Sequence, residues 1–164
     1  MSQDVAAQNL ATPKTPIILI KPGTGETLKL GPITCRIIED GSNTDHRIGT
    51  AEFIVPPNTT GHPPHWHQMH DEIFLVTTGT VQFRGANGIV DARPGDCVVV
   101  PIGAPHTFSN IGQEEARFVN TFNPSYYINY FRLLAAMYAD KPDLDEETVL
   151  ETMHPFGTLV AHGL

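Results

Sequence analysis

Cysteine, positive charge and long apolar runs are all scarce in this chain of 164 residues. It has only two cysteines, Cys35 and Cys97, so no disulfide framework is predicted and free thiols in a reducing cytosol are expected. Lys and Arg number 10 against 18 Asp and Glu, and the net charge of −8 argues against a nucleic-acid surface or a polybasic membrane contact. Pro16–Ile20 is too short to span a bilayer, and residues 1–16 lack the pattern of a secretory signal. We therefore expect a cytoplasmic protein that binds neither nucleic acid nor membrane.

Glycine and proline, by contrast, are abundant, with 14 of each. This content disfavours a helical protein and favours many short strands joined by turns. The chain length suits one domain with a full core and leaves no room for a second sizeable domain.

Short segments of strand character follow one another between residues 16 and 123, with no helical pattern between them. We therefore predict an antiparallel sandwich or barrel over residues 16–123, preceded by a loose, flexible arm over residues 1–15. The expected strands are Ile17–Ile20, Leu28–Leu30, Ile33–Ile38, Arg47–Val55, Glu72–Val76, Thr80–Arg84, Gly88–Asp91, Cys97–Val100 (as a buried strand), His106–Asn110 and Ala116–Phe122.

The pattern changes to a helical one in residues 124–164. Asn123 as N-cap and Pro124 at the first helical position predict the start of one helix, and Glu146–Met153 predicts a second. The first helix carries an apolar stripe, which we expect to pack on the outside of the barrel or against a partner subunit rather than to contact substrate. The stripe consists of Tyr127, Tyr130, Phe131, Leu134, Met137 and Tyr138.

Histidines are concentrated in residues 61–79, where His65 and His67 are two positions apart. Side chains alternate along a strand, so these two imidazoles face the same side and can bind one ion. Glu72 has the wrong parity to join them on one straight strand, so a turn or bulge is required before it. One more histidine, His106, lies in a second Gly- and Pro-rich stretch. The pattern indicates a metal site built across a β-sheet.

Two spaced patterns resemble the two motifs of the cupin superfamily: His65-x-His67-x4-Glu72-x6-Gly79, and Gly95-x5-Pro101-x-Gly103-x2-His106-x3-Asn110. One position departs from the family pattern. Thr59 stands where the leading glycine of the first motif is usual, and Gly61 comes two positions late. That glycine shapes a turn and holds no metal, so the departure leaves the predicted site intact.

The resemblance implies an all-β fold, a cupin jelly-roll β-barrel, here with a short C-terminal helical extension, similar to quercetinase-like single-domain members. It also implies one divalent metal ion per chain, bound by His65, His67, Glu72 and His106. Three imidazoles and one carboxylate leave open positions, which is typical of a catalytic rather than a structural site. Fe2+ is expected, with Mn2+, Ni2+, Co2+, Cu2+ or Zn2+ as alternatives that sequence does not separate. The alternative that the histidines only satisfy a turn is disfavoured by the joint spacing.

The predicted substrate pocket consists of three apolar side chains expected above the metal and one histidine: Phe74, Val76, Phe108 and His70. His70 is either an acid/base group or a residue at the rim, and its parity relative to His67 favours the rim. His62, in a Gly-His-Pro-Pro turn, is expected to be solvated. Asn110 is expected to close a turn or to make a supporting hydrogen bond.

Two classes of function are compatible with these features. The first is a metal-dependent enzyme acting on a small organic substrate, aromatic or enol/polyketide-like, most simply a dioxygenase-like oxidoreductase in which Glu72 is both ligand and base. A non-oxidative isomerase, cyclase or decarboxylase is the alternative within this class. The second class is a small-molecule-binding cupin without turnover. We also expect a homodimer, because an exposed sheet edge and an aromatic helical stripe are costly to leave in water.

Overall fold

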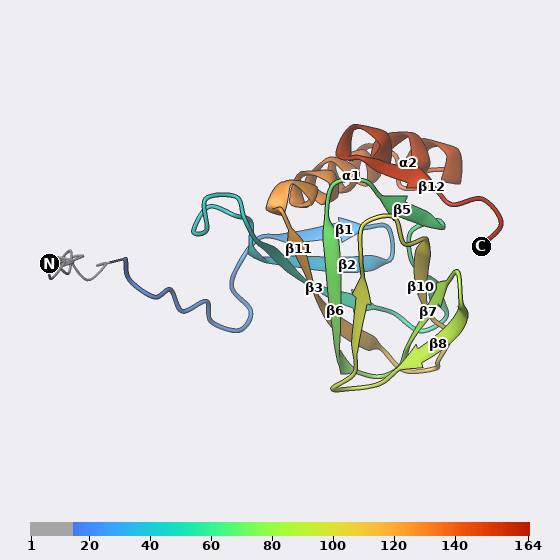
Figure 1. Ribbon diagram of the computed structural model, residues 1–164, viewed down its shortest axis with the longest axis horizontal. Helices are drawn as coiled ribbons and strands as arrows, with labels where there is room; N and C mark the ends of the chain where they lie inside the picture. Colours follow the sequence, from blue (N-terminus) through green and yellow to red (C-terminus); the bar gives the residue numbers. More distant parts are fainter. Residues whose placement is uncertain (1–14) are drawn as a thin grey trace, which may run out of the picture.

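The computed structural model describes residues 15–164, so the arm expected over residues 1–15 lies outside the described residues apart from Thr15. Two antiparallel sheets face each other in a jelly-roll arrangement (Figure 1), which confirms the predicted fold class. The first sheet has the order β1-β2-β3-β11-β6-β9, with strands at Thr27–Leu30, Ile33–Glu39, Gly49–Val55, Ala116–Asn123, Asp71–Thr78 and Cys97–Val100. The second has the order β12-β5-β10-β7-β8, with strands at Thr158–Val160, His65–His67, His106–Asn110, Val81–Gly85 and Gly88–Ala92, and β4 (Thr59–Thr60) also pairs with β10.

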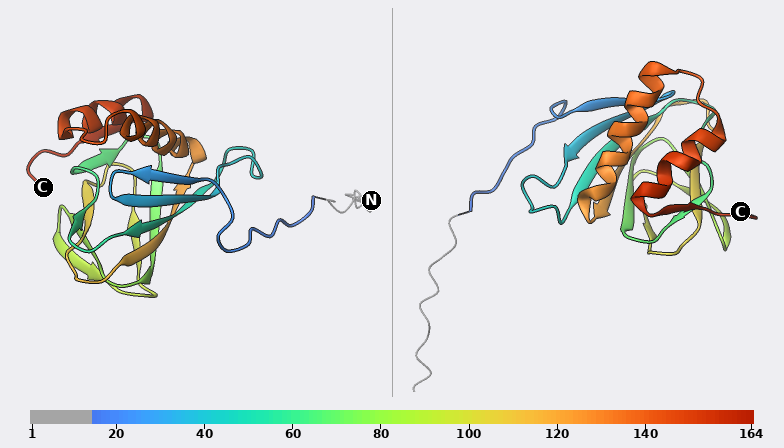
Figure 2. Two further views of the ribbon diagram at one scale, coloured as in Figure 1. Left: turned by 180° about the vertical axis from the view of Figure 1, so that it is seen from behind. Right: turned by 90° about the horizontal axis from the view of Figure 1, so that it is seen from above.

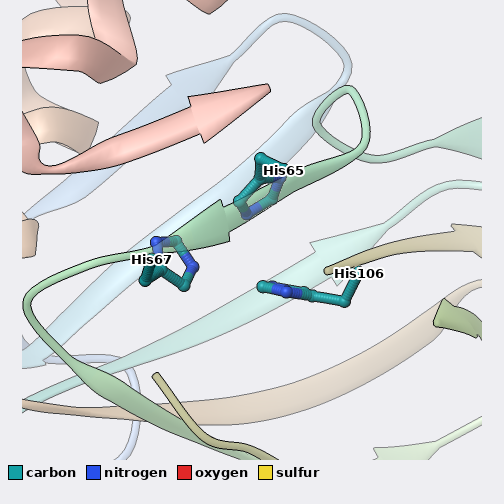
Figure 3. Close-up of side chains that lie close together, drawn as sticks. All are labelled: His65, His67 and His106. Atoms are coloured by element: carbon teal, nitrogen blue, oxygen red, sulfur yellow. The ribbon is translucent and has the colours of Figure 1, made fainter. Parts of the chain in front are cut away.

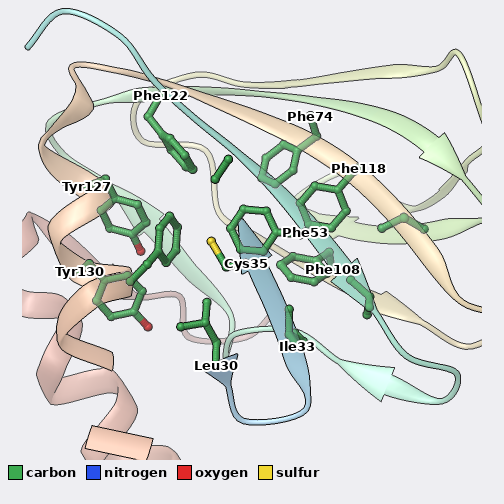
Figure 4. Packing of buried hydrophobic residues seen from close by; sticks show 14 of the residues in the cluster. Leu30, Ile33, Cys35, Phe53, Phe74, Phe108, Phe118, Phe122, Tyr127 and Tyr130 are labelled. Carbon is green, nitrogen blue, oxygen red and sulfur yellow. The ribbon is translucent and has the colours of Figure 1, made fainter. Parts of the chain in front are cut away.

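Aromatic side chains from the facing strands fill the interior of the barrel (Figure 4). Along β3 and β11 every second residue is buried, as expected for strands with one face toward a core. The rings of Phe53 and Phe118 stack with their centroids 5.0 Å apart, and Phe74 meets Phe118 at 5.4 Å. Phe74 also lies 6.1 Å from the ring of His106, so the apolar core extends up to the histidines.

Two strand predictions need correction. Ile17–Ile20 is not a strand: the segment runs away from the barrel (Figure 2), and Ile17 and Leu19 are 99% and 82% exposed. A short apolar run cannot form a strand unless a neighbouring strand pairs with it, and none does among the described residues. Cys97–Val100 does form β9 but is not buried, because it lies at the edge of the first sheet and pairs only with β6. Val99 is 63% exposed, and Val100 is the buried residue of this strand.

The predicted helices are present as α1 (Ile128–Asp140) and α2 (Glu146–Met153). A 3-10 turn at Ser125–Tyr127 precedes α1, and Asn123 is not its N-cap, because this residue is the last one of β11. At α2 the side chain of Asp145 caps the helix by accepting a hydrogen bond of 2.8 Å from the Thr148 backbone N–H.

Both helices lie across one end of the barrel (Figures 1 and 2), and neither is long and apolar enough to cross a membrane. After α2 a 3-10 turn at His154–Phe156 and Gly157, whose φ is 65°, redirect the chain into β12. Strand β12 then pairs with β5, placing Thr158 opposite His67 and Val160 opposite His65. The C-terminal segment therefore completes the sheet that carries the histidines.

Candidate metal centre

Three histidines converge inside the barrel (Figure 3). His65 and His67 lie on β5, and His106 lies on β10, directly opposite His65 in the pairing of the two strands. All three side chains are buried, and their ligand atoms lie within 4.8 Å of one another. The alternation along β5 therefore places the two histidines of the HxH pattern on the inner face, as the sequence predicts.

Each of these rings is oriented through its Nδ1 atom. His65 Nδ1 lies 2.7 Å from the Pro63 carbonyl oxygen and His106 Nδ1 lies 3.1 Å from that of Ala104. A carbonyl can only accept, so both Nδ1 atoms carry a proton. His67 Nδ1 lies 2.8 Å from Thr158 Oγ1. This arrangement leaves Nε2 of each ring available to a metal, the usual way in which outer partners fix a histidine ligand.

Glu72 on β6 brings a carboxylate to the same point. Its Oε2 lies 3.1 Å from His106 Nε2 and 3.2 Å from His67 Nε2. Its Oε1 accepts a hydrogen bond of 3.2 Å from Asn120 Nδ2. The turn between His67 and β6 resets the phase of the chain, which is how a residue of the wrong parity joins the histidines.

The hydrogen bonding of the histidines and of Glu72 indicates that these residues suit a divalent cation. His67 Nε2 is buried and makes no hydrogen bond. His106 has acceptors at both nitrogens, the Ala104 carbonyl and the Glu72 carboxylate, so its neutral form would turn a lone pair toward a carboxylate oxygen. Two acceptors at this distance repel unless a proton or a metal ion lies between them. The structure thus holds two groups close enough to bind a metal ion, which share His67: His65, His67 and His106, and His67, His70 and Glu72.

The pKa shifts agree with these ligand roles. Burial lowers the pKa of His65 well below its usual value and also lowers that of His67, so both are neutral near pH 7. Burial alone would raise the pKa of Glu72, but His67, His106 and His70 beside the carboxylate hold it well below the ordinary value. Neutral imidazoles and an ionised carboxylate are the forms that bind a metal.

His70 does not lie at the rim of the pocket, which is where strand alternation from His67 predicts it. Its side chain is 2% exposed, with Nε2 3.6 Å from Glu72 Oε1 and its ring centroid 3.9 Å from that of His67. The turn before β6 breaks the strand alternation on which the rim assignment depends. Its Nε2 atom is buried without a hydrogen-bond partner, so His70 lies beside the carboxylate as a second group able to exchange a proton.

A small cavity of about 20 Å³, the inner cavity, adjoins the ligands, and its volume is enough for about one water molecule. Phe74 and Phe108 line this cavity, as predicted, but Val76 does not. Val76 is opposite Phe118, further along β6 from Glu72, and belongs to the packed core. The other walls include Tyr127, Phe131 and His62.

The apolar stripe of α1 packs over the metal centre, which corrects its predicted place on the outside of the barrel. Tyr127 lies 4.3 Å from the ring of His70 and 5.0 Å from that of His67. Tyr130 lies 5.5 Å from His62 and is fully buried. The stripe therefore covers this end of the barrel and contributes to the burial of the histidines.

Three residues at the centre do not emerge from the sequence patterns. Asn120 donates a hydrogen bond to Glu72. A polar residue at an inward-facing position of β11 could have indicated such a role from the sequence. His62 is half-buried rather than solvated, and burial lowers its pKa from 6.5 to about 4. The position of His62, three residues before the proposed ligand His65, could have indicated from the sequence that it lies near the site. Thr158 lies 91 residues from His67 and carries no sequence signal.

Comparisons with known proteins agree with this description. The family model of the cupin domain matches residues 51–122. No curated protein matches the sequence. The structure of the polyketide cyclase RemF from Streptomyces resistomycificus is 23% identical with a TM-score of 0.57, covering 66% of this chain and 80% of that one.

Two further solved structures have the same fold. A predicted oxalate decarboxylase from Thermotoga maritima is 16% identical with a TM-score of 0.57, over 66% of this chain and 99% of the other. A sugar phosphate isomerase of the cupin superfamily from Silicibacter pomeroyi is 23% identical with a TM-score of 0.52, over 57% of this chain; the match spans 60% of the isomerase's length. These identities are low, so the likenesses establish the fold alone.

Proposed function

We propose that the protein is a metal-dependent enzyme acting on a small organic molecule, since residues 51–122 match the family model of the cupin domain. The observation that carries the proposal is the convergence of two imidazole Nε2 atoms on one carboxylate oxygen, at 3.1 and 3.2 Å, in a buried site beside a third imidazole. A structural zinc site would be closed by four ligands, often thiolates, whereas Cys35 and Cys97 are both free.

The proposed ligands are His65, His67, Glu72 and His106, and Fe2+ is the proposed ion, with Mn2+, Ni2+, Co2+, Cu2+ or Zn2+ as alternatives. When bound, the ion would act as a Lewis acid that polarises an oxygen of the substrate and acidifies the adjacent O–H or C–H.

Glu72 is the proposed base. Its lowered pKa makes it a weak base, so it can take a proton only from a substrate that is already acidified. Asn120 holds Oε1 at 3.2 Å and fixes the direction of the carboxylate. His70, 3.6 Å from the same oxygen, is placed to receive that proton or return it to the product.

We propose dioxygenase chemistry on an aromatic or enol substrate as the finer assignment. Its support is the inner cavity, where Phe74, Phe108 and Phe118 adjoin the ligands and offer a small apolar space that suits dioxygen. A non-oxidative isomerase, cyclase or decarboxylase is the second candidate. The pairing of Glu72 with His70 favours it, because two adjacent proton-exchanging groups suit proton transfer without an oxidant.

The test begins with metal analysis of the purified protein, for which about one divalent ion per chain is expected. Replacing both His67 and His106 by Ala should remove it, since only two of four ligands remain. Full occupancy in this double variant would refute the site. Oxygen uptake is then measured on Fe2+-loaded protein with catechols, flavonols and polyketide-like enols. Turnover with oxygen consumption supports the dioxygenase, turnover under argon supports the non-oxidative candidate, and binding without turnover supports the non-catalytic one.

We also propose that the protein is a homodimer in the cytoplasm. The aromatic stripe no longer supports a dimer, because it is buried against the barrel. The support is now the exposed Ile73 and Leu75 of β6 beside Val99 of the edge strand β9, together with the exposed Ile17 and its neighbours. The exposed free thiol of Cys97 suits a reducing compartment.

A further inference from the structure

Two spaces of very different size meet at the candidate metal centre. The inner cavity of about 20 Å³ touches Glu72, His65 and His106 but is too small for an organic substrate. Beside it lies an outer groove of about 520 Å³ between the second sheet and the two helices. This volume is in the range of small-molecule sites. His62 and Phe108 line both spaces and so form the wall between them.

The outer groove is apolar in its depth and polar at its edge. Leu30 and Ile33 of the β1–β2 hairpin and Phe108 of β10, all labelled in Figure 4, contribute to the apolar part together with Leu134 of α1. The polar edge includes Gln82, Arg84 and Glu146. A site of this kind buries the apolar body of a ligand and orients it through a few polar groups.

At His62 the backbone is fixed by hydrogen bonds, whereas within the described part of the chain the ring is held by packing alone. Gly61 donates its N–H to the Phe108 carbonyl at 2.9 Å, and the His62 carbonyl accepts a hydrogen bond of 2.7 Å from Thr107 Oγ1. Gly61 is required here, because a Cβ atom would lie 2.7 Å from the Phe108 ring. By contrast, neither ring nitrogen of His62 has a hydrogen-bond partner within residues 15–164. The ring rests against Tyr130 and Phe131, at 5.5 and 6.2 Å between centroids.

We propose that the outer groove binds the body of the substrate and that the His62 ring swings aside to let the reactive end reach the metal. The inference rests on the proposed function and adds where the substrate binds. The ligand it predicts is a planar organic molecule with an apolar body and a metal-binding oxygen at one end. The volume of the groove is large enough for such a molecule, and the His62 ring can turn because it is held by packing, without a hydrogen bond from the described residues to either ring nitrogen.

The test uses 4-nitrocatechol, a planar diol whose absorption changes when its oxygens bind a metal, and azide as a probe small enough to need no groove. The groove is blocked in a Ser109→Trp variant, since Ser109 lies on the outer face of β10 and lines the groove. Thr60→Trp, at an exposed lining position, is the second blocking variant. Val90→Trp places the same ring at an exposed position of β8, outside the groove, as the matched control.

In Fe2+-loaded protein we expect both blocking variants to weaken 4-nitrocatechol binding about tenfold or more, since the body of the probe loses its buried apolar contacts. Azide binding and metal content should stay unchanged, and Val90→Trp should match the unaltered protein with both probes. In a His62→Ala variant 4-nitrocatechol should associate faster while azide binds as before, because the wall is removed.

The outcomes separate the two proposals. Full metal content and azide binding, with 4-nitrocatechol binding unaffected in both blocking variants, would overturn the groove while leaving the metal-dependent function intact. The groove is overturned in the same way if the unaltered protein binds azide but not 4-nitrocatechol. Failure to bind Fe2+ or any other divalent ion would overturn the proposed function, and the groove inference with it.

Discussion

Replacing Thr158 by Val tests whether the C-terminal strand orients a metal ligand. Thr158 is fully buried, and its Oγ1 lies 2.8 Å from His67 Nδ1. Valine has the same shape as threonine but lacks the hydroxyl, so packing is retained and the hydrogen bond is lost. The backbone pairing of β12 with β5 does not depend on this side chain. The variant therefore removes the hydroxyl, with its contacts to His67 and Tyr127, and leaves the other residues of the site in place.

The expected size of the effect follows from two independent magnitudes. A buried ring nitrogen left without a partner costs about 1–3 kcal/mol. Loss of an outer hydrogen bond to a histidine ligand typically lowers metal affinity about 10- to 100-fold, which corresponds to about 1.4–2.8 kcal/mol. The two ranges overlap, so we expect the affinity of Thr158→Val for Zn2+ or Fe2+ to fall by one to two orders of magnitude.

The assay is competition for Zn2+ with a chromophoric chelator at constant pH, with thermal unfolding of the metal-free forms alongside. Thr158→Ser keeps the hydroxyl and should retain most of the affinity, which separates the hydrogen bond from the packing of the methyl group. Unchanged affinity in Thr158→Val, or an equal loss in both variants, would refute the role of the hydroxyl.

Three further expectations concern the base, the charge state and the assembly. Glu72→Gln should retain much of its metal and lose turnover by about two orders of magnitude or more, since it loses charge and basicity; recovery of activity in excess metal would make Glu72 a ligand only. The pKa of His62 falls from 6.5 to about 4 on burial, so the unfolded chain binds this proton more readily and the metal-free protein should lose stability as the pH falls from 6.5 to 4. Urea unfolding should show a shallower fall in His62→Gln, and an identical pH profile would contradict the burial of this ring. Light scattering at micromolar concentration should show a dimer that Val99→Lys weakens, whereas a monomeric unaltered protein would exclude the dimer.

The sequence predicts those parts of the fold that depend on local periodicity. Alternation along a strand places His65 and His67 on one face, and regular turns between short strands predict the β-sheet architecture. The turn at Arg93–Asp96, where the Asp96 N–H bonds the Arg93 carbonyl at 2.8 Å and Gly95 has a φ of 95°, also agrees with its local sequence, since Pro followed by Gly favours a type II turn. These features need only neighbouring residues.

The remaining features depend on contacts between distant segments. His70 was misplaced because the turn before β6 breaks the alternation, and no local pattern shows where such a phase change occurs. The position of α1 over the metal centre depends on which face of the barrel is open, which the stripe of Tyr127 and Tyr130 does not specify. The contact of Thr158 with His67 arises because β12 pairs with β5, and strand pairing across 91 residues leaves no trace in spacing.

The proposed metal ligands are synthesised before the segments that cover them. The ligands His65 to His106 leave the ribosome before α1, which closes the barrel, and before Thr158, which fixes His67. While the last third of the chain is still being made, an ion can reach the histidines without passing any wall. Once β12 has paired with β5 and α1 lies over the barrel, the histidines are buried and an ion must pass the aromatic side chains that cover them. For the proposed metal, we therefore expect a chain refolded in the presence of the ion to load faster than a folded metal-free one.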